Sequence, residues 1–100
     1  MVKHIILWTL KEMSEDEKTK VKAEIKTGLE SLAGKIPGLL DIKVISEGRL
    51  DSSNADVMLD SSFDSFDALK TYAKHPEHVK VADEKVRPFT ANRSCLDFEV

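Results

Sequence analysis

Residues 3–10 read Lys-His-Ile-Ile-Leu-Trp-Thr-Leu, and this apolar run fixes the first element of the fold. Successive side chains of a strand point to opposite faces, and in this run both faces are largely apolar. One face carries His4, Ile6, Trp8 and Leu10, and the other carries Ile5 and Leu7. The pattern predicts a strand that is buried on both sides.

A helix and three further strands are predicted from the spacing of apolar residues. Ser14 and Glu17 form a capping-box pattern ahead of an apolar stripe at helical spacing, so we expect a long amphipathic helix over residues 14–35. Runs rich in β-branched and apolar residues, bounded by turn residues, predict strands over 40–47, 55–63 and 93–100.

A pair of helices is predicted between the third and fourth strands. Ser65 can cap the first of them, which should end near Lys74 and His75, because proline disfavours helical backbone in the residue before it. Pro76 suits the first turn of the second helix, which should end before Pro88. We therefore expect a bend between two short helices at Pro76.

The predicted order is strand, helix, strand, strand, helix pair, strand. This order is typical of an α+β, ferredoxin-like βαββαβ subunit with a four-stranded antiparallel sheet, here forming a single domain over residues 1–100. We expect the helices to cover one face of the sheet and place His4, Ile6 and Trp8 on the other, open face. An open apolar surface usually marks an interface, so we predict a homodimer through the sheet face, with a dimeric α/β barrel between the subunits.

Composition limits the possible partners and location. The 15 Lys and Arg and 18 Asp and Glu give a formal charge of −3 with mixed signs along the chain, so nucleic acid is not expected as a partner. The N-terminal apolar run is too short to span a bilayer and lacks a cleavage site, so we expect a cytoplasmic protein with no membrane partner. The single cysteine, Cys95, cannot form an internal disulfide, which fits a reducing compartment.

The segment Tyr72-Ala-Lys-His-Pro-Glu-His78 gathers two of the three histidines and the only tyrosine. The bend at Pro76 should bring Tyr72 and His78 together, where a phenol and an imidazole can transfer protons. A helix N-terminus disfavours nearby positive charge, so His78 is expected to stay neutral and able to accept a proton. The alternative is a structural corner in which Tyr72 packs and His78 bonds to the backbone.

A metal site is a weaker alternative for the same histidines. His75 and His78, together with His4 or Cys95, would supply three of the N and S ligands that zinc prefers. The helix break between His75 and His78 makes their spacing weak support for a metal. No glycine-rich phosphate loop, carboxylate dyad or Ser/His/Asp arrangement stands out either. We therefore predict no cofactor and no metal.

Several segments stand out together, namely Val2–Trp8, Ile36–Gly38, Phe63–Ser65, Tyr72 with His75–Val79, and Asp97-Phe98. In combination they resemble the stress-responsive A/B barrel (Dabb) family over almost the whole chain. The resemblance implies a dimeric α/β barrel of ferredoxin-like subunits, in agreement with the predicted topology. It implies less about activity, because most members have no established reaction, while a few plant relatives are cofactor-free polyketide cyclases.

In those cyclases the catalytic tyrosine and histidine match Tyr72 and His78, and a pocket residue matches His4. The resemblance therefore implies an aldol cyclisation in which His78 is the base and Tyr72 donates to the enolate oxygen. The cyclases line their cavity with aromatic residues from the first helix, where this chain has Ile25 and Leu29. A pocket shaped for their substrates is not implied.

We expect the barrel interior to bind a small, largely apolar molecule. The residues predicted to line this site are His4, Ile6, Trp8, Ile25, Leu29 and His75. One alternative is a cofactor-free, polyketide cyclase-like lyase that uses His78 and Tyr72. Another is a stress-linked structural or oligomeric protein without catalysis, and oxygen chemistry, found in other dimeric α/β barrels, is a minor third.

Overall fold

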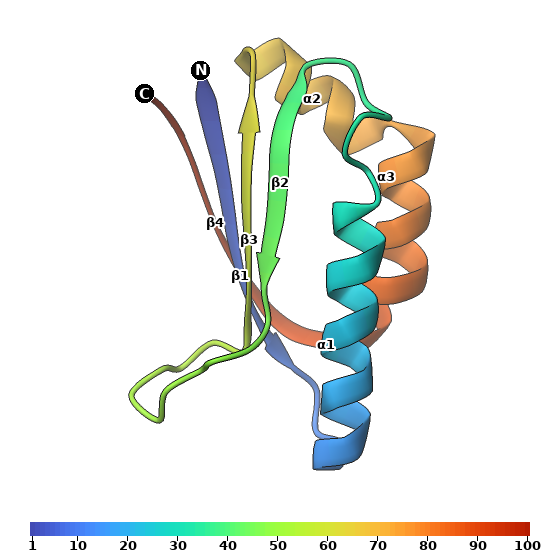
Figure 1. Cartoon of the computed structure of the whole chain (residues 1–100), viewed down its shortest axis with the longest axis vertical. Helices are drawn as coiled ribbons and strands as arrows, with labels where there is room; N and C mark the ends of the chain where they lie inside the picture. The colour runs from blue at the N-terminus through green and yellow to red at the C-terminus, as the bar shows by residue number, and fades with distance from the viewer.

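Strand β1 (Val2–Leu10) lies inside a four-stranded sheet, as its apolar character predicts (Figure 1). The structure, a computed structural model, describes all residues from 1 to 100. The strand order is β2-β3-β1-β4, and all neighbouring strands are antiparallel. The other elements are α1 (Glu15–Glu30), β2 (Leu39–Ile45), β3 (Val57–Phe63), α2 (Phe66–Lys74), α3 (Pro76–Val81), a π turn (Ala82–Val86), a 3-10 turn (Arg87–Phe89) and β4 (Thr90–Glu99). This arrangement confirms the predicted α+β, ferredoxin-like subunit.

Helix α1 begins where the capping-box pattern predicts it. The Ser14 hydroxyl accepts a hydrogen bond from the backbone N–H of Glu17 at 3.2 Å. The helix ends at Glu30, before the predicted residue 35, because the chain turns there and Gly34 adopts a φ of 78°. Leu32 is nevertheless 1% exposed, so the apolar stripe continues past the helix and conceals its end in the sequence.

Pro76 separates α2 from α3 as predicted. Helix α2 ends at Lys74, His75 is extended with φ −65° and ψ 132°, and Pro76 occupies the first turn of α3. Strand β4 starts at Thr90, earlier than the predicted residue 93, because its pairing with β1 reaches Leu10. The corner between α2 and α3 places Tyr72 and His78 side by side.

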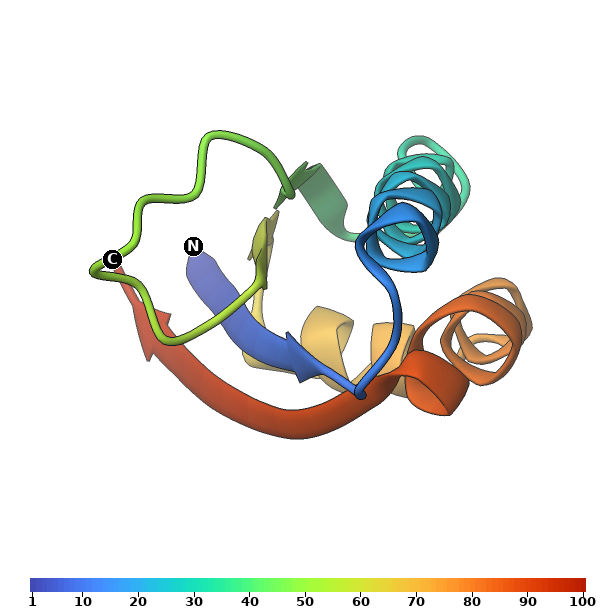
Figure 2. The same cartoon turned by 90° about the horizontal axis from the view of Figure 1, so that it is seen from below.

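The helices all lie on one side of the sheet (Figure 2). This is the side that carries the even-numbered residues of β1, and it was predicted to be the open one. His4, Ile6 and Trp8 point toward the helices and are only 6%, 5% and 5% exposed. Their predicted place on the open face was therefore wrong. Alternation divides a strand into two faces, but it does not say which face meets the helices when both are apolar.

The opposite face of the sheet is open and apolar, as predicted, but with other residues. Its apolar side chains are Ile5, Leu7, Ile45, Met58, Leu96 and Phe98. Leu96 and Leu7 are 63% and 41% exposed. We call these six residues the open face.

The core lies between the helices and the covered face of the sheet. Its largest side chains with almost no exposure are Ile25, Leu29, Leu32, Leu59, Phe63 and Tyr72. Among these only Tyr72 carries a polar group, so its hydroxyl is surrounded by an otherwise apolar core. None of the helices has the length and apolar character needed to cross a membrane.

Candidate functional site

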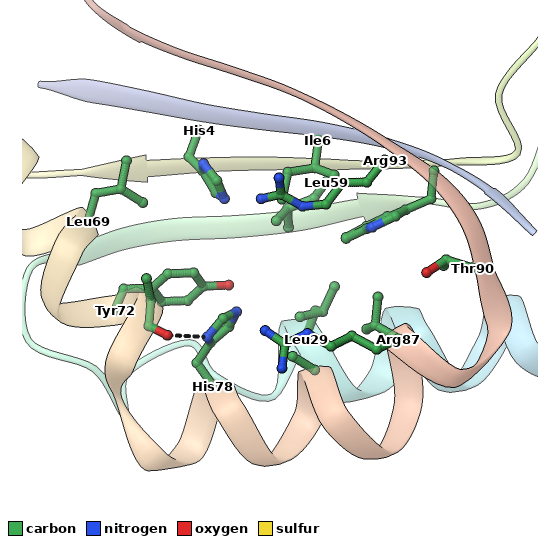
Figure 3. Close-up of a pocket in the computed structure, with 14 residues that line it drawn as sticks. His4, Ile6, Leu29, Leu59, Leu69, Tyr72, His78, Arg87, Thr90 and Arg93 are labelled. Atoms are coloured by element: carbon green, nitrogen blue, oxygen red, sulfur yellow. Dashed lines mark hydrogen bonds between the residues drawn. The ribbon is translucent and has the colours of Figure 1, made fainter.

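A cavity of about 150 Å³ lies between the covered face of the sheet and the α2–α3 corner (Figure 3). Its lining is mostly apolar with a few polar groups, as in most small-molecule sites. The 14 residues that line it are His4, Ile6, Trp8, Leu29, Leu59, Leu69, Tyr72, Ala73, His78, Ala82, Val86, Arg87, Thr90 and Arg93. A cavity of this volume suits a molecule the size of a benzene ring.

Tyr72 brings a buried hydroxyl without a hydrogen-bond partner to this cavity. The side chain is 1% exposed, and its oxygen is buried and unpartnered. Phe63 holds the ring edge-on at 4.9 Å between ring centres. Burial raises the pKa of Tyr72, so the hydroxyl keeps its proton and can donate it in a hydrogen bond. An oxygen atom of a bound molecule would satisfy this hydroxyl.

His78 offers a free ring nitrogen beside Tyr72, with 4.2 Å between the two ring centres. Its Nδ1–H donates to the carbonyl oxygen of Ala73 at 3.3 Å, so Nε2 keeps its lone pair (Figure 3). Burial is the main cause that lowers the pKa of His78, and the positive charges of Arg87 and Arg93 add to it. The hydrogen bond to Ala73 opposes this shift without reversing it. His78 is therefore a neutral imidazole that can accept a proton.

His4 places a second imidazole in the cavity wall, opposite the helices. Its Nδ1–H donates to the carboxylate of Asp97, which leaves Nε2 without a protein partner on the cavity side of the ring. The His4 ring lies edge-on to Phe63 and Tyr72, with ring centres 6.3 and 6.2 Å apart. The hydrogen bond to Asp97 and these two rings hold the imidazole in one orientation.

Two arginines give the cavity a positive lining. The guanidinium of Arg87 pairs with Asp83 on the preceding helical turn, whereas Arg93 forms no ion pair. No carboxylate is among the lining residues. The lining therefore favours a ligand with a negatively charged or electron-rich oxygen over a cation.

The structure brings together most of the predicted site residues. His4, Ile6, Trp8, Leu29, Tyr72 and His78 all line the cavity. Ile25 is fully buried in the core and does not line it. His75 lies outside the cavity and caps α3, because its Nδ1 accepts from the backbone N–H of Glu77 at 3.1 Å.

Three further residues of the site were not predicted from the sequence. Arg87 lines the cavity from the 3-10 turn before β4, and Arg93 lines it from β4 itself. Asp97 orients His4 across the β1–β4 pair. Only the register between the first and last strands reveals this pair, since Asp97 and His4 are far apart in the sequence.

The sequence model of one protein family, the stress-responsive A/B barrel domain (Dabb), matches residues 2–100 of the chain. Among curated proteins, none matches this chain by sequence.

Solved structures resemble the chain over nearly its whole length. A dimeric protein of unknown function and ferredoxin-like fold from Bacteroides fragilis is 33% identical, with a TM-score of 0.91, and 99% of this chain and 95% of that chain are covered. A dimeric ferredoxin-like protein of unknown function from Thermobifida fusca is 22% identical, with a TM-score of 0.82 and coverage of 99% and 90%. The hydroxynitrile lyase of Passiflora edulis is 18% identical, with a TM-score of 0.71 and coverage of 97% and 90%. The likeness to the last two shows the fold alone.

Proposed function

We propose that this chain, which belongs to the stress-responsive A/B barrel (Dabb) family, binds a small carbonyl compound in the cavity beside Tyr72 and His78. The observation that carries this proposal is the buried Tyr72 hydroxyl without a partner. A buried hydroxyl without a partner costs about 1–3 kcal/mol, and a ligand oxygen would recover this energy. The apolar lining would hold the carbon skeleton, and the arginines would favour an anionic group.

We further propose that the bound carbonyl compound undergoes cofactor-free acid–base chemistry. Nε2 of His78 takes a proton from the carbon next to the carbonyl, and the Tyr72 hydroxyl donates a hydrogen bond to the oxygen that gains negative charge. The protonated His78 then returns the proton to carbon or to a leaving group. Support comes from the lowered pKa of His78 and from its position beside Tyr72. The hydroxynitrile lyase adds no support for this chemistry, because its likeness shows only the fold.

Binding is tested by calorimetric titration of benzoate and cyclohexanone, two single-ring compounds that suit the cavity volume. Benzoate combines a ring with an anionic oxygen, and cyclohexanone has a neutral carbonyl. We expect saturable binding of at least one of them, weakened about tenfold by Tyr72→Phe because one hydrogen bond is lost. Absence of binding, or equal affinity in the variant, would contradict the proposed site.

Catalysis is tested separately by the exchange of α-hydrogens of cyclohexanone and pyruvate for deuterium in heavy water, followed by NMR. We expect the chain to accelerate exchange, and His78→Ala to lower this acceleration by about 10²–10⁴-fold. His75→Ala is the matched control, because His75 lies outside the cavity, and it should keep the wild-type rate. Binding without accelerated exchange would leave the binding site in place and exclude the acid–base step.

We also propose that two copies of the chain pair through the open face. The support is the exposure of Leu7, Leu96 and Phe98, together with the dimeric state of the 33% identical protein. The proposed ligand cavity lies on the other side of the sheet, between the sheet and helices of one subunit. In this proposal the ligand lies in a cavity within each subunit, rather than between the subunits in the interior of the barrel.

A further inference from the structure

His4, Cys95 and Asp97 form a second cluster, on the side of the His4 ring that faces β4. Strand pairing sets His4 opposite Asp97, and Cys95 lies two positions earlier on the same face of β4. The Cys95 Sγ is 3.5 Å from Asp97 Oδ1 and 3.9 Å from His4 Nδ1. One imidazole nitrogen, one sulfur and one carboxylate oxygen thus lie within 4.8 Å of one another.

We infer that this cluster binds one divalent cation of the zinc type, with His4 Nδ1, Cys95 Sγ and a carboxylate oxygen of Asp97 as its ligands. Zinc is bound tetrahedrally by such ligands at about 2.0–2.3 Å, which separates them from one another by about 3.3–3.7 Å. The two distances from Cys95 are close to this range. Three protein ligands leave a fourth position for water, as in sites where zinc remains accessible.

The cluster combines one fixed ligand with two adjustable ones. The His4 side chain is 8% exposed and held by its aromatic neighbours, whereas the Asp97 side chain is 35% exposed. His4 and Asp97 now share a hydrogen bond, which brings them closer than two ligands of one cation. When a cation replaces this proton, the exposed carboxylate has room to move outward.

Charge and access also favour a cation. A thiolate and a carboxylate supply two negative charges, which balance a divalent ion, and Cys95 is an exposed free thiol. The cluster lies on the covered side of the sheet, at the end of β4 that the helices leave exposed. Pairing of two copies through the open face would use the other side of the sheet and leave the cluster accessible.

Cation binding at this cluster also bears on the cavity, because His4 belongs to both. Without a cation, Nδ1 donates its proton to Asp97. With a cation on Nδ1, the ring carries its one remaining proton on Nε2, which can then only donate. Occupancy of the cluster would thus fix Nε2 of His4 as a hydrogen-bond donor on the cavity side.

The test is a titration of metal-free, untagged protein with Co²⁺, whose thiolate complexes absorb in the near ultraviolet, followed by displacement with Zn²⁺. We expect one Co²⁺ per chain and a thiolate-to-cobalt band that Zn²⁺ abolishes. Asp97→Asn should weaken binding by at least about tenfold, and Cys95→Ser should remove the band. Both residues are exposed, so neither change should unfold the chain.

A matched control moves the thiol to the other face of the sheet. The double variant Cys95→Ser with Ser94→Cys keeps one cysteine per chain, and Ser94 pairs with Leu7 of the open face. We expect no cobalt band in this variant. An equally strong band there, or unchanged affinity in Asp97→Asn, would overturn the site and indicate binding to any free thiol.

A second measurement tests whether His4 is a ligand. Nitrogen NMR of histidine-labelled protein should show the Nδ1 signal of His4 shifting when Zn²⁺ is added, because Nδ1 exchanges its proton for the cation, with Nε2 in the protonated range at saturation. The signals of His75, outside the cluster, serve as the internal reference. Unchanged His4 signals at saturating Zn²⁺ would contradict the inference.

Discussion

The two faces of the sheet differ in what they carry, although both are apolar along β1. The covered face holds a small cavity with Tyr72, His78 and His4 around it. The open face holds exposed apolar side chains such as Leu7 and Leu96. Polar groups that are buried beside a cavity suit a ligand, whereas exposed apolar groups on a sheet suit a partner surface. We therefore propose a ligand at the covered face and the second subunit at the open face.

The largest expected effect is on stability, and it should differ between substitutions on the covered face and on the open face. Phe63 is 0% exposed on the covered face, so Phe63→Ala should lower the free energy of unfolding by about 3–5 kcal/mol. Phe98 is 40% exposed on the open face, and Phe98→Ala should change it by about 0.5 kcal/mol or less in the monomer. Denaturant titration at low protein concentration measures both, and equal losses would contradict the assignment of the faces.

The next effect concerns assembly. Leu7→Asp places a charge on the open face, so we expect the dimer dissociation constant to rise at least about a hundredfold, because an unpaired buried charge costs several kcal/mol. Light scattering should then report a monomer. Leu50→Asp is the control, since Leu50 lies in the β2–β3 connection at 71% exposure, and it should remain dimeric. A dimeric Leu7→Asp variant would show that the subunits pair elsewhere.

A smaller effect tests the unpartnered hydroxyl of the covered face. Tyr72→Phe should raise the free energy of unfolding of the ligand-free protein by about 1 kcal/mol, because a buried unsatisfied hydroxyl is removed. Ser61 is the matched control, since its buried hydroxyl donates to the His4 carbonyl at 3.0 Å. Ser61→Ala should lower stability by about 1 kcal/mol. A loss of stability in Tyr72→Phe would mean that its hydroxyl has a structural partner.

The smallest effect is a pH dependence from His78. Its pKa is lowered in the folded state from the ordinary value of 6.5, mainly by burial, so the unfolded chain binds more protons below that pH. The stability that depends on His78 is complete above about pH 6.5 and is lost as the pH falls toward the lowered pKa. His78→Gln should remove this part of the slope. Identical pH profiles in denaturant titrations of variant and wild type would contradict the burial of His78.

The fold was predictable because its signals are local. The Ser14 cap, the break at Pro76 and the β-branched strands each determine one element, and their order determines the topology. Two details were not predictable. The end of α1 was not, because Leu32 continues its apolar stripe beyond the last turn. The face of β1 that meets the helices was not either, because β1 is apolar on both sides.

The site was predictable only in part. Tyr72 and His78 lie six residues apart in a single segment, so the bend alone brings them together. His4 was predicted for the site, but its partner Asp97 depends on the pairing of the first and last strands. Ile25 was misplaced because helical spacing alone does not separate the cavity wall from the core behind it.

The most direct test of the central claim is a crystal structure of the protein soaked with benzoate, a planar anion that resembles an enolate. We predict benzoate inside each subunit, with its carboxylate within hydrogen-bond distance of the Tyr72 hydroxyl and its ring against the apolar lining of the cavity. Benzoate bound between two open faces, with the cavity beside Tyr72 and His78 empty, would contradict the assignment of the ligand to the covered face.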